Sequence, residues 1–184
     1  VDTIGTRNSE WRELDFSVYD AVFHVAGIAH VKENESNKFL YYQVNRDLAV
    51  SIAKKAKTQG VKHFIFLSSM SVYGLRKGLI KKETEPDPKN NYGKSKLQAE
   101  KIINDLQDKT FKVATIRPPM VYGKGCKGNY TRLAKIASSV PIFPQMKNER
   151  SMIYIDTLSE FVKSIVDRER TGTFFPQNKE YVCT

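Results

Sequence analysis

The 184-residue sequence has few cysteines and no long hydrophobic run. Its two cysteines, Cys126 and Cys183, lie far apart and form no spacing typical of metal ligands, so we predict no metal site. Sparse cysteine use is typical of a reducing compartment, and we expect a cytoplasmic protein. No apolar stretch approaches the roughly 20 residues that a membrane-spanning helix needs, and we find no signal-peptide pattern. We therefore expect no membrane partner.

Acidic residues are outnumbered, with 20 Asp and Glu against 30 Lys and Arg, which gives a formal net charge of +10. Such a balance can indicate binding to nucleic acid, to an acidic surface or to a phosphate-bearing ligand. The lysines are scattered, and several fall near helix ends where they complement the helix dipole. Because no nucleic-acid-binding motif accompanies them, we predict that the protein does not bind nucleic acid.

Three nearly continuous apolar runs predict strands that are buried on both faces, as in a parallel sheet. They cover residues 19–27, 61–67 and 111–117. Helical patterns over residues 36–58 and 92–106 lie between them, and Gln59-Gly60 ends the first helix. Strands alternating with helices indicate right-handed βαβ crossovers. The sequence therefore predicts an α/β fold with a doubly wound parallel sheet.

The composition changes after Gly123, where glycine and proline interrupt the chain around a short predicted helix over residues 130–138. We predict that residues 1–123 form the main sheet domain. Residues 124–184 are predicted to form part of a smaller lobe, with a last segment that returns to the sheet.

The pair Tyr92 and Lys96 carries the clearest chemical signal. Their i, i+4 spacing places both side chains on one helix face, and Asn90 and Asn91 can cap the helix start. The helix N-terminus and the Lys96 ammonium both favour phenolate, so we predict a lowered pKa for Tyr92, as suits a general acid or base. The alternative is a solvated helix face. A second Tyr-x-x-x-Lys match at Tyr73 contains a glycine and lies outside a capped helix, so we discount it.

Small and hydroxyl residues end two of the predicted strands. Ala26-Gly27 allows close approach of a backbone or ligand, and Ser68-Ser69 falls where open α/β sheets bind ligands, although serines also begin turns. We expect His24 to be a hydrogen-bonded core histidine. Asn45 is either a buried bracket between loops or a residue of the polar helix face.

Six segments occur in the order and spacing of a known family. They are FHVAG (23–27), VN (44–45), FLSSMSVYG (66–74), YGKSK (92–96), RPPMVYG (117–123) and RSMIYID (150–156). On these motifs the chain resembles the extended short-chain dehydrogenase/reductases, namely the NAD-dependent nucleotide-sugar epimerase/dehydratases close to the UDP-glucose 4-epimerase group. The resemblance covers nearly the whole chain.

The resemblance implies an NAD-dependent epimerase, or a 4-keto reductase, that acts on a nucleotide-diphosphate sugar. Tyr92 would be the catalytic base, Lys96 would hold the nicotinamide ribose, and Ser69 would hydrogen-bond the reacting oxygen. The residues expected to contact NAD are Val25, Ala26, Gly27, Asn45, Leu67, Tyr92, Lys96 and Pro119. Those expected to contact the sugar nucleotide are Ser69, Met120, Asn129 and Arg150.

The chain also departs from the family's pattern. The family opens with a strand and a Gly-x-x-Gly-x-x-Gly turn that binds the pyrophosphate, and Gly5 alone cannot replace that turn. Many members have asparagine where this chain has Met120. We expect a partial Rossmann-like domain from a fragment or truncated product, with weak NAD binding by itself. The alternative is a non-catalytic remnant or interaction module. Homodimers are expected through the helices at 36–58 and 92–106.

Overall fold

The computed structural model describes residues 1–29, 33–75, 77–81, 83–126, 129–139, 149–178 and 182–183. Its centre is a four-stranded parallel sheet with the strand order β1-β2-β3-β7. The strands are β1 (Ala21–His24), β2 (His63–Leu67), β3 (Lys112–Ile116) and β7 (Gly172–Phe174). The predicted α/β fold with a parallel sheet is confirmed.

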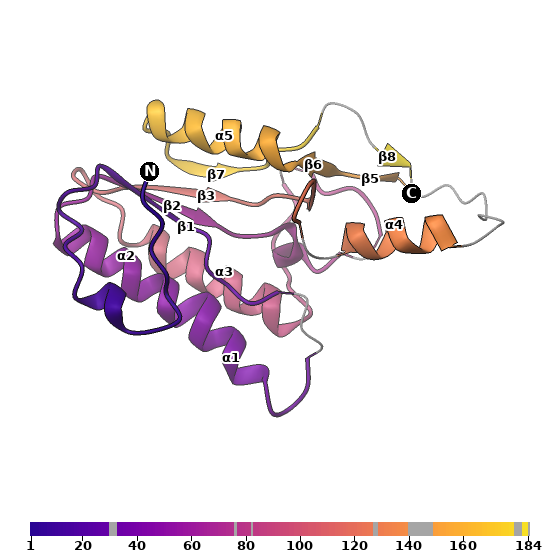
Figure 1. Ribbon diagram of the computed structural model, residues 1–184, viewed down its shortest axis with the longest axis horizontal. Coiled ribbons are helices and arrows are strands. Elements are labelled where there is room, and N and C mark those ends of the chain that lie inside the picture. Colours follow the sequence, from indigo (N-terminus) through magenta and orange to yellow (C-terminus); the bar gives the residue numbers. More distant parts are fainter. Residues whose placement is uncertain are drawn as a thin grey trace.

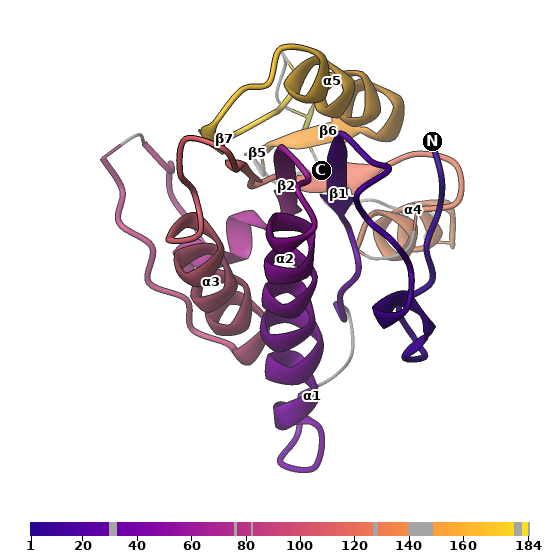
Figure 2. The same cartoon turned by 90° about the vertical axis from the view of Figure 1, so that its left-hand side faces the viewer.

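Helices cover both faces of this sheet (Figures 1 and 2). One face carries a continuous helical segment and a second helix, which are α1 (Lys38–Tyr42), the π-helical turn η2 (Gln43–Leu48), α2 (Ala49–Thr58) and α3 (Asn91–Asn104). The opposite face carries α5 (Ile155–Asp167). The sheet is therefore doubly wound, as its buried strands require.

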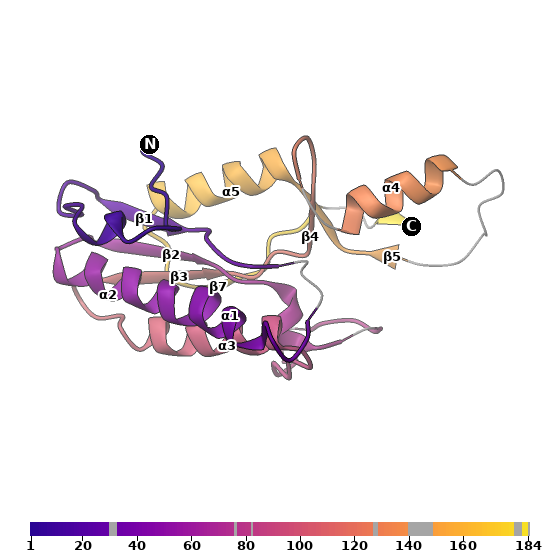
Figure 3. The ribbon, with the colours of Figure 1, turned by 60° about the horizontal axis from the view of Figure 1, so that its bottom comes forward.

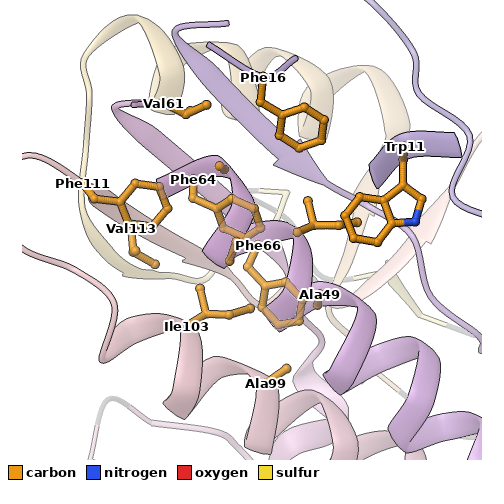
Figure 4. Packing of buried hydrophobic residues seen from close by; sticks show 13 residues of the cluster. Trp11, Phe16, Ala49, Val61, Phe64, Phe66, Ala99, Ile103, Phe111 and Val113 are labelled. Carbon is orange, nitrogen blue, oxygen red and sulfur yellow. The ribbon is translucent and has the colours of Figure 1, made fainter. Parts of the chain in front are cut away.

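Side chains alternate across the sheet and divide the core into two clusters. On β2, Phe64 and Phe66 pack against α2 and α3, in a cluster that Trp11 and Phe16 of the N-terminal segment complete (Figure 4). Ile65, between the two phenylalanines, packs with residues of β3 and α5 on the other face. This two-residue period is the one expected for a strand that is buried on both sides.

The smaller elements gather beyond the carboxyl ends of the sheet strands (Figures 1 and 3). They comprise η3 (Met70–Tyr73), α4 (Asn129–Ser139) and two short strand pairs, β4 (Met120–Tyr122) with β6 (Met152–Tyr154) and β5 (Glu149–Arg150) with β8 (Val182–Cys183). A further short helical turn, η1 (Glu10–Arg12), lies near the start of the chain. The chain returns to the main sheet at β7, which pairs in parallel with β3.

Strand β1 lies at an edge of the sheet. Across the described part of the chain it pairs with β2 alone, and Phe23 and Val25 are 39% and 56% exposed there. The searched helices include none that is both long and apolar enough to cross a membrane.

Candidate active site

The first turn of α3 presents Tyr92 at the carboxyl end of the sheet. The Asn90 side chain accepts a 2.8 Å hydrogen bond from the Gly93 N–H, which confirms the predicted cap. A second cap comes from Glu33, whose carboxylate accepts from the N–H groups of Asn91 and Tyr92 at 3.2 and 3.1 Å. Sequence reasoning missed Glu33, because nothing in the local pattern links it to a helix 58 residues further along the chain.

Gly93 lets the segment after β2 approach α3 closely. A Cβ atom at this position would lie 2.5 Å from the main-chain oxygen of Ser71 and 2.9 Å from Cβ of Pro88. This approach brings Ser69, which caps η3 by accepting a 3.1 Å hydrogen bond from the Ser71 N–H, within hydrogen-bonding reach of the Tyr92 phenol. The structure thus brings the segment of the predicted serine against the helix turn of the predicted tyrosine.

The predicted lowering of the Tyr92 pKa is wrong for the chain in this state. Burial of the phenol dominates and raises the pKa above its ordinary value. The hydrogen bond with Ser69 lowers the pKa, and the nearby Tyr41 raises it. The sequence argument counted the charges near the helix start but could not include the desolvation of the ring.

Lys96 lies one turn further along α3, with 4% of its surface exposed. Its Nζ donates a 2.8 Å hydrogen bond to the Leu67 carbonyl at the end of β2 and lies 4.7 Å from the centre of the Phe66 ring. Burial lowers the pKa of Lys96 to about 8, against the opposing effect of the Glu100 carboxylate. The ammonium is therefore held at the carboxyl end of the sheet strands, where the family resemblance places a cofactor.

Asn45 proves to be a buried bracket, which settles the alternative that its sequence pattern left open. Its Oδ1 accepts from the Ile28 N–H at 2.8 Å, and its Nδ2 donates to the Ile28 carbonyl at 3.1 Å. The same Nδ2 donates to Ser95 Oγ at 3.2 Å, and Ser95 in turn donates to the Tyr92 carbonyl. The loop after β1 is thereby joined to α3 through the π-helical turn, a feature frequent at functional sites.

Gly27 lies close against this bracket, where a larger residue would not fit. A Cβ atom there would lie 2.9 Å from Asn45 Oδ1 and 3.3 Å from Lys96 Nζ, and the glycine itself is exposed. Val25 is also exposed, whereas Ala26 is half-buried. A small residue next to a buried ammonium is the arrangement that a bound polar group can approach, so these residues fit the nicotinamide ribose that the resemblance assigns to them.

A cavity of about 140 Å³ adjoins this strand end, and Val25, Ala26 and His24 line part of it. His24 is buried, and its ring lies nearly parallel to those of Phe64 and Phe66, as a core histidine should. The expectation that it is fully hydrogen-bonded is wrong, because its buried Nε2 has no partner among the described residues. Burial and, to a lesser extent, the Lys96 charge together lower the pKa of His24 to about 3.

The residues predicted to contact the sugar nucleotide are more widely spread. Pro119 and Met120 follow β3. This segment is joined to the serine loop, the residues 68–74 that follow β2, by a 3.2 Å hydrogen bond from the Met70 N–H to the Pro118 carbonyl. Arg150 is exposed on β5, beyond the end of the sheet (Figure 3). Asn129 begins α4, but its side chain lies outside what the structure describes.

A buried ion pair behind the site also escaped the sequence analysis. Arg117 donates from Nε and Nη2 to the Glu100 carboxylate at 3.0 and 2.5 Å, and from Nη1 to the Tyr73 hydroxyl at 2.7 Å. The pair joins α3 to the residue that follows β3. The sequence gives little sign of it, because Glu100 and Arg117 lie 17 residues apart and Glu100 is followed by the charged Lys101.

A doubly wound parallel sheet with a serine, a tyrosine and a lysine at the carboxyl ends of its strands defines the class of short-chain dehydrogenase/reductases. The chain belongs to the NAD dependent epimerase/dehydratase family, whose model matches residues 5–175. The family resemblance stated from the motifs is therefore confirmed.

Curated proteins that the chain resembles include sugar 4-epimerases. It is 34% identical over 171 residues to the UDP-glucose 4-epimerase of Vibrio cholerae, covering 87% of this chain and 52% of that protein. It is 34% identical over 150 residues to N-acetyl-alpha-D-glucosaminyl-diphospho-ditrans,octacis-undecaprenol 4-epimerase of Escherichia coli O157:H7, with coverage of 79% and 45%. The chain thus spans about half the length of these curated relatives.

Among solved structures, UDP-glucuronic acid 4-epimerase from Bacillus cereus in complex with NAD superposes with a TM-score of 0.79. It is 23% identical, and the match covers 94% of this chain and 59% of that one. MoeE5 in complex with UDP-glucose and NAD gives a TM-score of 0.75 at 22% identity, with coverage of 94% and 62%. At these identities the likeness shows the fold.

Proposed function

We propose that the protein containing this chain is an NAD-dependent epimerase, or a 4-keto reductase, that acts on a nucleotide-diphosphate sugar. The observation that carries the proposal is the buried Lys96, whose Nζ is held at the end of β2 and lies close beside Gly27, one helical turn from Tyr92 and its neighbour Ser69. Relatives named as 4-epimerases, and fold neighbours solved with NAD and UDP-sugars, support it.

Each of the three side chains has a role that its position suits. Tyr92 would remove the proton of a sugar hydroxyl, and Ser69 would hold the oxygen that loses it, since both hydroxyl groups lie together. Lys96 would donate to the ribose hydroxyls of NAD. Bound NAD would supply the hydride acceptor, and an epimerase would return that hydride to the other face of the 4-keto sugar.

The cofactor would lie against the carboxyl ends of the sheet strands, where Lys96 bonds the last residue of β2. The proposed contacts are Val25, Ala26, Gly27, Asn45, Leu67 and Pro119, in addition to Tyr92 and Lys96. The raised pKa of Tyr92 means that the phenol of the chain alone is protonated at neutral pH. Its use as a base therefore requires a fall in this pKa when the site is filled, which positive charge next to the phenol would produce.

The substrate would reach the site from the smaller elements beyond the sheet. We propose that residues 124–184 contribute to this lobe, with Met120, Asn129 and Arg150 in contact with the nucleotide sugar. An exposed guanidinium such as that of Arg150 suits the diphosphate, because its planar fork can bind two phosphate oxygens at once.

The test measures activity and cofactor binding in the protein that contains this chain. Tyr92→Phe should lower the interconversion of a UDP-hexose and its 4-epimer by several orders of magnitude while circular dichroism stays unchanged. Lys96→Met should weaken calorimetric NAD binding, whereas Lys101→Met, an exposed lysine of the same helix, should not. Near-normal turnover by Tyr92→Phe would contradict the proposal.

The competing proposal is a non-catalytic Rossmann-like module that cannot hold NAD by itself. The one-sided pairing of β1 in the described part of the chain favours it, because an open sheet edge leaves that side of the cofactor region uncovered. Calorimetry of the chain alone distinguishes the two, and we expect weak binding. Tight binding of NAD by the chain alone would exclude the module.

Association of two copies is a further part of the proposal. Apolar side chains are exposed on the helices of one face, at Phe39 and Leu40 of α1 and Ile102 of α3. We expect a homodimer through these helices, which sedimentation equilibrium would detect as a doubled mass. Ile102→Glu should then restore the mass of a monomer.

A further inference from the structure

Glu33 places a full negative charge against the start of α3. One carboxylate oxygen accepts from the Asn91 N–H at 3.2 Å and from Asn91 Nδ2 at 3.1 Å. The other accepts from the Tyr92 N–H at 3.1 Å. Together with the Asn90 side chain on the Gly93 N–H, these bonds satisfy the first three N–H groups of the helix.

We propose that Glu33 is the positioning residue of Tyr92, which fixes the first turn of α3 and offsets the positive helix end beside the phenol. The inference rests on the proposed role of Tyr92 in proton transfer. Glu33 contacts the main-chain N–H of Tyr92 and not its hydroxyl, so Glu33 acts on the reaction indirectly.

The physical argument starts from the helix dipole. The unsatisfied N–H groups at a helix start carry roughly half a positive charge, and this charge stabilises a nearby phenolate. A carboxylate bonded to those same groups cancels the effect and favours the neutral phenol. On this proposal the carboxylate removes a positive charge that would otherwise oppose burial, which is the main cause of the raised pKa of Tyr92.

Other groups face Tyr92 from the elements packed around it. Tyr41 of α1 is buried and raises the pKa of Tyr92, while Ser69 from the serine loop lowers it. The field of Glu33 reaches Tyr41 as well, because burial and then Glu33 raise the pKa of that phenol. Lys96 is the buried cation of the same helix, and its ammonium is directed to the Leu67 carbonyl.

Glu33 also connects the segment after β1 with the start of α3. It follows the loop at Ile28, which the Asn45 bracket holds, and it precedes α1. The hydroxyl of Tyr42 on α1 donates to Asn91 Oδ1 at 3.0 Å, so the first residue of α3 is held from that side too. A shift of the strand-end loop would therefore move the start of α3.

The experiment measures the ionisation of Tyr92 in the chain itself. Tyrosine labelled with ¹³C at Cζ gives one NMR signal per ring, and Tyr92→Phe identifies the signal that belongs to Tyr92. In Glu33→Gln, which keeps the shape but removes the charge, we expect the pKa of Tyr92 to fall by about 0.2 to 0.7 of a pH unit.

Glu35→Gln is the matched control, since this exposed glutamate of the same segment pairs with Lys38 instead of α3. It should leave the Tyr92 signal unchanged. An unaltered Tyr92 pKa in Glu33→Gln, or an equal fall in both variants, would overturn the proposal.

The role of Glu33 can also be tested without a variant and without ligands. If Glu33→Gln does not fold, hydrogen exchange of the unaltered chain replaces it: the Asn91 and Tyr92 amides should be protected, and exchange at the rate of free amides would overturn the proposal. The titration needs neither NAD nor sugar. Failure of the proposed activity would therefore leave the Glu33 result standing, and the reverse also holds.

Discussion

The ammonium of Lys96 donates a 2.8 Å hydrogen bond to the main-chain carbonyl of Leu67, and this contact ties helix α3 to the end of strand β2. A lysine so deeply buried is held by a neutral acceptor and by the face of the Phe66 ring. Both partners stabilise the charged form less than water would. The helix that carries Tyr92 is thus anchored by a charge that the fold disfavours.

This burial makes the stability of the chain depend on pH. The pKa of Lys96 is about 8 in the folded chain, below the ordinary value of 10.5 that the unfolded chain retains. Between these values the unfolded state binds more protons, so the free energy of unfolding rises with pH, by at most about 1.4 kcal/mol per pH unit. Urea unfolding from pH 7.5 to 10.5 should show this rise, and Lys96→Met should lack it. Equal pH dependence in both proteins would contradict the prediction.

Replacing Gly93 should destabilise the fold although alanine favours a helix. A Cβ atom would meet the Ser71 carbonyl at 2.5 Å, and main-chain atoms cannot turn aside as a side chain can. We expect Gly93→Ala to lose about 1 to 3 kcal/mol in urea unfolding. Gly5→Ala, where a Cβ atom would meet nothing within 4 Å, is the control and should change little. A gain in stability at Gly93 would show that the serine loop can move away.

Removing the Asn45 side chain should loosen the loop after β1. Asn45→Ala leaves the half-buried Ile28 N–H and carbonyl without their side-chain partners. An unpaired buried group costs about 1 to 3 kcal/mol, and these two groups are only half-buried, so we expect a total loss of about 2 to 4 kcal/mol, in the lower part of the summed range. Gln43→Ala, at an exposed position of the same π-helical turn, should stay within about 0.5 kcal/mol. Equal losses would mean that the bracket adds no stability.

Breaking the buried ion pair should lower the free energy of unfolding more than removing a surface charge does. Glu100 is 2% exposed and accepts hydrogen bonds from Arg117. Glu100→Gln therefore leaves the guanidinium without a counter-charge and with one acceptor oxygen in place of two. We expect a loss of about 3 kcal/mol, at the lower end of the range for such pairs because the amide keeps one acceptor oxygen. Glu160→Gln, on the exposed side of α5, is the control. Calorimetric unfolding of both variants measures the difference.

Much of the scaffold follows from local pattern. The three apolar runs became β1, β2 and β3, and β2 and β3 are buried between two helical layers as predicted. The prediction that the first run is buried on both faces is wrong, because β1 lies at the edge of the described sheet and Phe23 is 39% exposed. The Asn90 cap was likewise predictable, since it involves neighbours three residues apart. The fourth strand of the sheet, β7, was expected only as an extended returning segment.

The interior of the site was not predictable in the same way. Asn45 could be assigned to the bracket only once Ile28 and Ser95 were placed around it. Glu33 and the pair of Glu100 with Arg117 are contacts between residues far apart in the chain, and charge at a position does not reveal its partner. The direction of the Tyr92 pKa failed for a related reason, because desolvation depends on every atom around the ring.

The sequence by itself determined the α/β class, the helix that bears Tyr92 and Lys96, and the family, because periodicity and motif spacing are properties of short stretches of chain. Only the tertiary structure decided that Ser69 meets Tyr92, that Lys96 binds Leu67, and that Glu33 caps α3. Those relations depend on distances between separate segments. Burial in the interior of low polarity then shifts the pKa of Tyr92 and Lys96.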